Sequence, residues 1–143
     1  MKIKVVDVIN LYGYLKQVEQ ALFNFKFSYA IVKNIDRLET EMKLIQKKEE
    51  MLKGYKEKTR PLYEKHGTKA ANGNIAVPQA NIEAFRAEVA VIDASDEFKQ
   101  VLADWKAFTE EECDFEPFQF DLDVLPKEIT GAEIRLMKPL IKE

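Results

Sequence analysis

The stretch SYAIVKNIDRLETEMKLIQKKEEML, residues 28–52, decides the fold of this chain. Its apolar residues recur at alternating spacings of four and three, and only Glu49 interrupts the series. The series consists of Ile31, Ile35, Leu38, Met42, Ile45 and Leu52. Such spacing places the residues along one face of an α-helix. The stretch therefore predicts a long helix whose apolar seam must be buried against another element.

A second seam with the same kind of spacing follows later in the chain. It consists of Ile82, Phe85, Val89, Ile92, Phe98, Val101, Trp105 and Phe108. Between the seams, residues 67–78 are rich in Gly, Asn, Pro and Ala, and Asn72-Gly73 is typical of a hairpin turn. We therefore predict a mainly α fold built on an antiparallel pair of long helices, a coiled-coil-like hairpin, with a small β element and short flanking helices.

A length of 143 residues favours a single domain. The expected parts are an N-terminal helix and bend (1–27), a long helix ending at Gly67 (28–66), a turn (67–78), a return helix (79–111), and a strand-like segment with a C-terminal helix (112–143). We expect Pro61 to kink the long helix or to end it one turn early. Ser95 or Asp96 could begin a new helix, so a break in the return helix stays open.

The N-terminal part predicts a helix from Val5 or Asp7 to Leu22, with Asp7 as a possible cap. The motif FNFKF, residues 23–27, is compatible with a strand, with a bend or with continuous helix, and Ser28 could cap the helix that follows.

The C-terminal part contains FEPFQFDLDVLP, residues 115–126, in which apolar and polar residues alternate. We expect a strand here that pairs either with the 67–78 turn or with the N-terminal segment. Thr130 and Glu133 have the spacing of a capping box, which predicts a short helix that stops at Pro139.

Charge is distributed unevenly along the chain, although the net charge is only -3. Residues 33–69 contain eleven Lys and Arg against seven Asp and Glu, whereas residues 81–123 contain thirteen acids against three bases. Exposed ion pairs contribute only about 0–1 kcal/mol each, so we expect them to select the register of the two arms. The bases are interleaved with acids and no nucleic-acid motif accompanies them, so we do not expect a nucleic-acid partner.

Residue types suited to catalysis are scarce. His66 is the only histidine and Cys113 the only cysteine, so an intrachain disulfide is excluded, and a nucleophile–base pair or a zinc site is not expected. We expect His66 to be either a cation favoured by the helix dipole at the C-terminal end of the long helix or simply an exposed side chain. We predict no enzyme activity, no catalytic residue, no cofactor and no metal.

The stretch EEECDFEPFQFDLD, residues 110–123, is the densest acidic region and also contains aromatic residues. A solvated helix end is one interpretation of it. The other is an acidic-aromatic surface that docks a basic groove of another protein. Its candidate residues are Glu110, Glu111, Glu112, Asp114, Phe115, Glu116, Phe118 and Phe120.

No stretch reaches the roughly 18–20 apolar residues needed to cross a bilayer. Asp7 and Asn10 interrupt the N-terminal apolar residues, so a signal peptide is not expected. A single cysteine fits a reducing compartment. These features predict no membrane association and a cytoplasmic location.

Several segments together resemble a family of small, uncharacterised helical proteins encoded by bacteriophages and prophages. The resemblance extends over most of the chain and is carried by SYAIVKNIDRLETEMKLIQKKEE (28–50), KHG (65–67), NGN (72–74), NIEAFRAEV (81–89) and ITGAEIRLMKPLI (129–141). The chain departs from the family in DEFKQVLADWKAF (96–108). The resemblance implies a viral origin and a role inside an infected or lysogenic bacterium, and it supplies no catalytic residues.

These features lead us to expect a phage- or prophage-encoded factor that binds a host or phage protein. A virion component or an assembly chaperone is the first alternative, and an enzyme with a carboxylate metal site is the least favoured. The sequence leaves open the partner, the oligomeric state, and whether the role is regulatory, inhibitory or structural.

Overall fold

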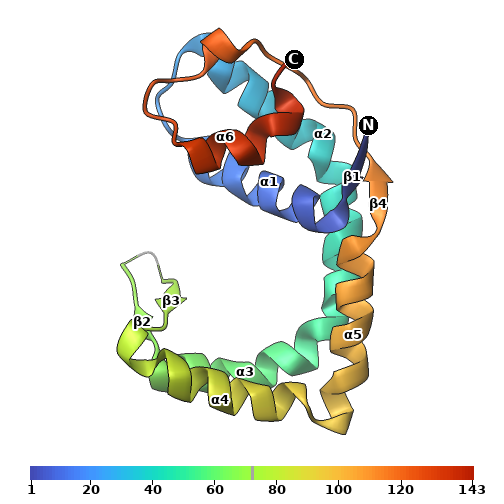
Figure 1. Ribbon diagram of the computed structural model, residues 1–143, viewed down its shortest axis with the longest axis vertical. Helices are drawn as coiled ribbons and strands as arrows, with labels where there is room; N and C mark the ends of the chain where they lie inside the picture. The colour runs from blue at the N-terminus through green and yellow to red at the C-terminus, as the bar shows by residue number, and fades with distance from the viewer. Residues whose placement is uncertain (72) are drawn as a thin grey trace. The chain divides into compact units, whose positions relative to one another are not determined.

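The computed structural model describes residues 1–71 and 73–143 (Figure 1). The fold is mainly α, as predicted. The contacts group into two compact units, where the sequence led us to expect one domain. Unit 1 comprises Met1–Lys47 and Phe108–Glu143, and unit 2 comprises Lys48–Ala107.

Unit 1 combines a short sheet with helices from both ends of the chain. Its elements are β1 (Lys2–Lys4), α1 (Val5–Val18), α2 (Phe25–Glu49, through Lys47), β4 (Glu112–Asp114), a 3₁₀ turn (Leu122–Val124), α6 (Gly131–Met137) and a second 3₁₀ turn (Lys138–Leu140). β1 and β4 are antiparallel, with Ile3 opposite Cys113. The chain after β4 runs back along unit 1 to α6 (Figure 1).

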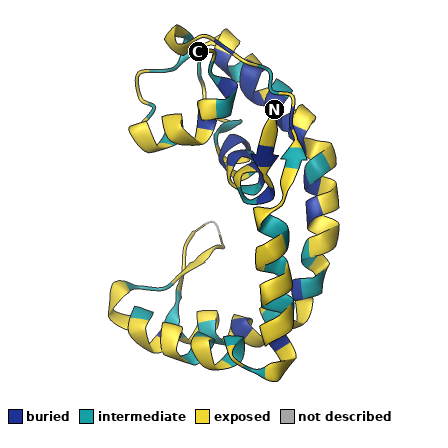
Figure 2. Cartoon of the chain, turned by 45° about the vertical axis from the view of Figure 1, so that its right-hand side comes forward, coloured by how far each residue is buried: buried dark blue, intermediate teal, exposed yellow. Residues whose placement is uncertain are grey.

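The core of unit 1 buries the first apolar seam from Ile31 to Ile45, and Leu52, the last residue of the seam, is buried in unit 2. Its most deeply buried side chains are Val8, Leu11, Leu15, Phe27, Ile31, Leu38, Met137 and Leu140, each at most 2% exposed. Figure 2 shows buried residues gathered on α1, α2 and the neighbouring elements of this unit. The part of the predicted long helix that ends at Lys47 is therefore stabilised by packing within unit 1.

Asn34 fixes the segment after β4 to α2. Its side chain is fully buried, and its Oδ1 accepts a hydrogen bond from the Phe118 amide (2.8 Å). Its Nδ2 donates to the carbonyl oxygens of Phe118 (2.9 Å) and Ala30 (2.8 Å). The carboxamide therefore forms hydrogen bonds with both the amide and the carbonyl group of Phe118, as the backbone of a neighbouring strand would.

The strand expected within residues 115–126 is not observed, because a side chain takes the place of a partner strand. The strand lies just before this segment, at β4, and it pairs with the N-terminal segment. Phe120 makes a single parallel bridge with Ile141. Pairing with the N-terminal segment was one of the two predicted alternatives.

Helix α1 begins at Val5, one of the two predicted positions, but its cap and its end differ from prediction. Asp7 lies in its first turn, whereas the capping position is Lys4, whose side chain makes no capping bond. The amide of Val5 instead donates to the carbonyl oxygen of Glu111 (2.9 Å), so the sheet satisfies the helix start. The helix ends at Val18, and Leu22 is fully exposed.

The FNFKF motif contains the beginning of α2. Phe25 is the first helical residue, and the Oδ1 of Asn24 accepts a hydrogen bond from the amide of Phe27 (2.9 Å). Asn24 therefore caps the helix, whereas Ser28, the predicted cap, lies inside it. The predicted capping box of Thr130 and Glu133 is present at α6.

Unit 2 contains the helical hairpin. Its elements are a 3₁₀ turn (Glu50–Leu52), α3 (Lys53–His66), β2 (Thr68–Lys69), β3 (Ile75–Ala76), a 3₁₀ turn (Gln79–Asn81), α4 (Ile82–Asp93) and α5 (Asp96–Glu110, through Ala107). The Tyr55 hydroxyl donates to Asp93 Oδ1 (2.6 Å), and the rings of Tyr63 and Phe85 are 4.8 Å apart. These contacts make α3 and α4 antiparallel, as predicted for this part of the two arms.

The turn between α3 and α4 contains the expected small β element. β2 and β3 are antiparallel, and Gly73 has a φ of 86°, which glycine adopts without strain. Asn72, the other residue of the predicted turn signal, lies outside the described residues. α3 ends before Gly67, whose backbone is extended, and a Cβ at this position would collide with Cγ2 of Ile75 and the Tyr63 carbonyl oxygen.

Both predicted arms are interrupted, but the first is interrupted at an unexpected place. α3 continues through Pro61 to His66, and the departure from α geometry falls at the 3₁₀ turn Glu50–Leu52. Pro61 therefore does not end the helix, although its ring removes one backbone donor. The return arm breaks at Ala94 and Ser95, which answers the question left open by the sequence.

Candidate functional site

Two of the predicted acidic residues form ion pairs with β1. Glu110 accepts a hydrogen bond from Lys4, and Asp114 lies beside Lys2, with both N–O distances at 2.9 Å. The hydrogen bond from Lys2 lowers the pKa of the Asp114 carboxyl. All four side chains are largely exposed, so these pairs contribute little to stability. They do reduce the negative charge of the predicted surface.

The other predicted acids have exposed carboxylates, and the backbone carbonyl groups of two of them accept hydrogen bonds. Glu111, Glu112 and Glu116 are all exposed. The carbonyl oxygen of Glu111 caps α1, and that of Glu116 accepts a hydrogen bond from Nη1 of Arg37 (3.1 Å).

Burial removes two of the three predicted aromatic residues from the surface. Phe115 is 4% exposed and Phe120 is 6% exposed, and the Phe120 ring meets that of Phe27 edge-on at 5.6 Å. Both are core side chains in this conformation. Phe118 is half-buried and is the one predicted aromatic residue that reaches the surface.

Phe118 belongs to a row of exposed rings that the sequence analysis missed. Phe25 is 81% exposed and stacks on Tyr29 at 6.0 Å, and Tyr29 meets Phe118 edge-on at 5.5 Å. Lys33 lies over the Tyr29 ring (5.7 Å) and Arg37 over the Phe118 ring (5.6 Å). We call Phe25, Tyr29 and Phe118 the aromatic row.

The aromatic row lines a hollow of about 630 Å³ between the start of α2 and residues 118–124. Asp121, Asp123 and Lys26 add charges to its lining. Asn24 donates a hydrogen bond from Nδ2 to the Val124 carbonyl oxygen (3.0 Å), which ties the two walls together. We call this feature the aromatic hollow.

The signal that could have revealed the aromatic row lies in α2 itself. Phe25, Tyr29 and Val32 are spaced four and three residues apart, and each is at least 44% exposed. They form a second apolar stripe that is out of phase with the buried seam. A second stripe on one helix indicates a second contact surface.

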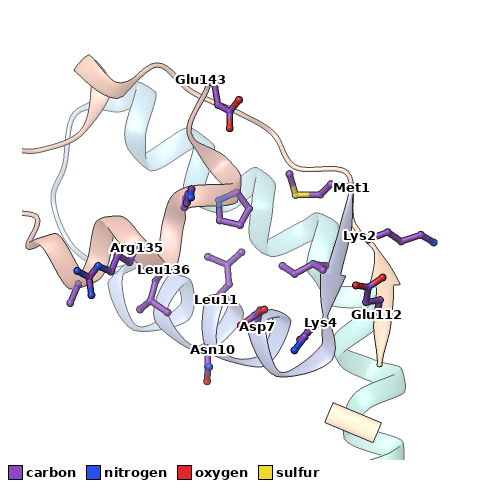
Figure 3. Close-up of a pocket in the computed structure, with 14 residues that line it drawn as sticks. Met1, Lys2, Lys4, Asp7, Asn10, Leu11, Glu112, Arg135, Leu136 and Glu143 are labelled. Atoms are coloured by element: carbon purple, nitrogen blue, oxygen red, sulfur yellow. The ribbon is translucent and has the colours of Figure 1, made fainter. Parts of the chain in front are cut away.

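A second hollow, of about 650 Å³, lies beside β1 (Figure 3). Its walls come from β1, α1, α6 and the 3₁₀ turn Lys138–Leu140. Leu136 supplies apolar surface beside the buried Leu11, and Lys4, Asp7 and Arg135 supply charges (Figure 3). Pro139 also lines the hollow. We call this feature the β1 hollow.

A hydrogen bond between Tyr14 and Glu133 holds α6 in place at the β1 hollow. The Tyr14 hydroxyl donates to Oε2 of Glu133 at 2.5 Å, and Oε1 of the same carboxyl closes the capping box with Thr130. The hydrogen bond from Tyr14, followed by those from Thr130, lowers the pKa of Glu133. Burial and the nearby carboxylate raise the pKa of Tyr14.

Replacement of Glu133 by glutamine is expected to make unit 1 less sensitive to acid. Because the pKa of Glu133 is depressed on folding, its contribution to stability is complete above the unfolded value near 4.5 and is lost as the pH falls through the folded value. Glutamine preserves the acceptor for Tyr14 but does not titrate. The slope of stability against pH below 4.5, measured by urea unfolding, should therefore be shallower in E133Q. An unchanged slope would contradict the assignment, and Y14F should also flatten it.

His66 lies in the last turn of α3, as expected, but its side chain is only 12% exposed. Its Nε2 lies 2.7 Å from Oε2 of Glu88, and Oε1 of the same carboxylate accepts a hydrogen bond from Lys65 (2.7 Å). These two hydrogen bonds, that from Lys65 first, lower the pKa of Glu88. The cluster joins α3, in the basic arm, to α4, in the acidic arm.

Residues 1–71 and 73–143 include no group of three or more His, Cys, Asp or Glu placed to hold a metal ion. Cys113 is half-buried on β4, and burial raises the pKa of its thiol. None of the helices in the described part of the chain combines the length and apolar character needed to cross a bilayer. Comparison with protein-family models, curated proteins and solved structures finds no match to this chain.

Proposed function

We propose that this protein is a non-enzymatic binding factor that docks a segment of another protein in the aromatic hollow. The observation that carries the proposal is the aromatic row, in which Tyr29 contacts both Phe25 and Phe118 at the surface. Apolar side chains at the surface are stabilised when they are removed from water, and a binding partner that covers this stripe would do so. Aromatic residues of this kind are enriched at the energetic centres of protein interfaces.

The lining of the hollow defines the partner's chemistry. Asp121 and Asp123 favour a basic residue, and the exposed ring of Phe25 can hold a Lys or Arg by cation–π contact. Asp121 already lies near Lys142 (3.5 Å), which leaves Asp123 as the stronger attraction. The partner we propose is therefore an apolar segment that carries a Lys or Arg.

The location and the origin of this activity are part of the same proposal. The resemblance to phage and prophage proteins motivates a host or phage protein as the partner, in the bacterial cytoplasm. Service as a virion component or an assembly chaperone would also use a protein-binding surface. Presence in purified virions would favour that alternative.

The test is a quantitative pull-down from bacterial lysate with four forms of the full chain. Phe25→Ala and Tyr29→Ala alter the aromatic hollow. Val91→Ala is the matched control, since Val91 is an exposed apolar residue (73%) of unit 2. We expect one protein to be retained by wild type and V91A and lost with F25A and Y29A, and the purified partner should bind at least about tenfold more weakly to Y29A. Nuclease treatment of the lysate separates protein from nucleic-acid partners.

The acidic cluster predicted from sequence is tested in the same experiment. Charge reversal at Glu111, Glu112 and Glu116 leaves the aromatic hollow unchanged. Loss of the partner in this variant, with retention by Y29A, would overturn the aromatic hollow in favour of the acidic surface. Absence of a specific partner for wild type would overturn the proposal as a whole.

A further inference from the structure

β1 has one edge paired with β4 and one edge without a strand partner. On the paired side, the α-amino group of Met1 donates to the Phe115 carbonyl oxygen, and the Phe115 amide donates to the Met1 carbonyl oxygen, both at 2.9 Å. Two residues further on, Ile3 is opposite Cys113. Val5 then donates to the Glu111 carbonyl oxygen. The odd-numbered residues therefore direct their backbone groups toward β4.

The even-numbered residues must direct their backbone groups to the other edge, because hydrogen-bonded and non-hydrogen-bonded pairs alternate in an antiparallel ladder. These groups are the amide and carbonyl of Lys2 and the amide of Lys4; the carbonyl of Lys4 starts the bonding of α1. Neither amide has a hydrogen-bond acceptor within the described parts of the chain. An edge of this kind is a template for one more strand.

The β1 hollow lies along this free edge. In Figure 3, β4 stands on one side of β1, and Leu11, Leu136 and Arg135 lie on the other. The hollow of about 650 Å³ therefore offers both backbone partners and walls for side chains. The free backbone edge belongs to β1, whereas the walls of the hollow come mainly from α1 and α6, so the two observations are independent.

The walls select the side chains of an added strand. Arg135 and Lys138, on the α6 side, form no ion pair within the described residues, whereas Lys2 and Lys4 are already paired with acids of 110–114. Asp7, Glu112 and Glu143 also line the hollow, so an acidic residue is favoured only next to Arg135 and Lys138. Leu136, which is 37% exposed, supports an apolar residue in the floor of the hollow.

We propose that the free edge of β1 binds an extended, acidic-apolar segment of another protein by strand addition in the β1 hollow. Main-chain hydrogen bonds to Lys2 and Lys4 would fix the register, and the walls would select alternate side chains. This surface is separate from the aromatic hollow, so the inference holds or fails independently of the proposed function.

Lys4 provides a matched pair of variants for the test. Its φ of −71° is the value that proline adopts, so Lys4→Pro removes the outward amide without a change of backbone. Lys4→Ala removes the same side chain and the same ion pair with Glu110 but keeps the amide. A difference between the two variants therefore measures the backbone donor alone.

The experiment selects binders from a random library of 12-residue peptides with the full-length wild-type chain. Enriched peptides are sequenced, synthesised and titrated by fluorescence polarisation. We expect sequences that alternate apolar and acidic residues, with binding at least about tenfold weaker to K4P than to K4A. In a series of peptides that each carry one N-methylated backbone amide, binding should be lost only when the methyl group is on every second residue.

Several outcomes would overturn the inference. These are a library that enriches no peptide, equal affinities for K4P and K4A, or peptides whose binding is lost in Y29A, which would place them in the aromatic hollow. Should K4P fail to fold, the N-methylation series on wild type decides the question, because uniform tolerance of N-methylation excludes strand addition.

Discussion

Replacement of Asn34 by alanine is expected to lower the free energy of unfolding of unit 1 by about 2–4 kcal/mol. The carboxamide makes three hydrogen bonds in a fully buried position, and two of them satisfy the backbone of Phe118. Alanine leaves the Phe118 amide and carbonyl without these partners. The segment after β4 should therefore detach from α2 before the rest of the unit unfolds.

Asn34→Asp is the sharper variant, because it keeps the shape and removes the donor. Its carboxylate would lie against the carbonyl oxygens of Ala30 and Phe118, so we expect a loss at least as large as that of N34A. Asp36→Ala, at an exposed position of the same helix, should change stability by less than about 0.5 kcal/mol. Urea unfolding measures the loss, and hydrogen exchange at the Phe118 amide localises it. Retained protection of that amide in N34A would contradict the assignment.

Replacement of Phe27 by alanine is expected to cost about 3–5 kcal/mol, the range for deleting a fully buried aromatic side chain. Phe27 is 0% exposed and meets the rings of Phe23 (5.0 Å) and Phe120 (5.6 Å) edge-on. The ring therefore joins the start of α2 to the C-terminal segment. Its loss leaves a cavity that only partial collapse can fill.

Phe25→Ala is the matched control, because the same residue type lies two positions away with 81% exposure. We expect F25A to change stability by less than about 0.5 kcal/mol and yet to weaken partner binding, whereas F27A destabilises the fold. Thermal and urea unfolding of both variants provide the comparison. Equal losses of stability would show that FNFKF does not have the burial described here.

Periodicity alone predicted most of the helices. The first seam is completely buried, and the mainly α class, the helix end at His66, the β element in the turn and the Thr130–Glu133 capping box were all predicted correctly. The helix end, the turn and the capping box depend on contacts between residues a few positions apart, so the local sequence is enough to reveal them.

The candidate site was predicted only in part. Phe118 reaches the surface, but Phe115 and Phe120 are buried because the Asn34 carboxamide holds their segment against α2. Alternation of apolar and polar residues shows that two faces differ, but it cannot show which face is covered. Phe25 and Tyr29 were missed because the prediction considered only the buried seam of α2, and these two residues lie out of phase with it.

The sequence by itself determined the mainly helical class, the two seams and the turn between α3 and α4, since helical spacing and glycine conformation are local properties. Only the tertiary structure decided that the Asn34 side chain replaces a strand for Phe118, that β4 pairs with β1, and that Phe25 stays exposed while Phe27 is buried. The physical reason is that hydrogen bonds and burial between residues about a hundred positions apart depend on chain packing, which no local pattern encodes.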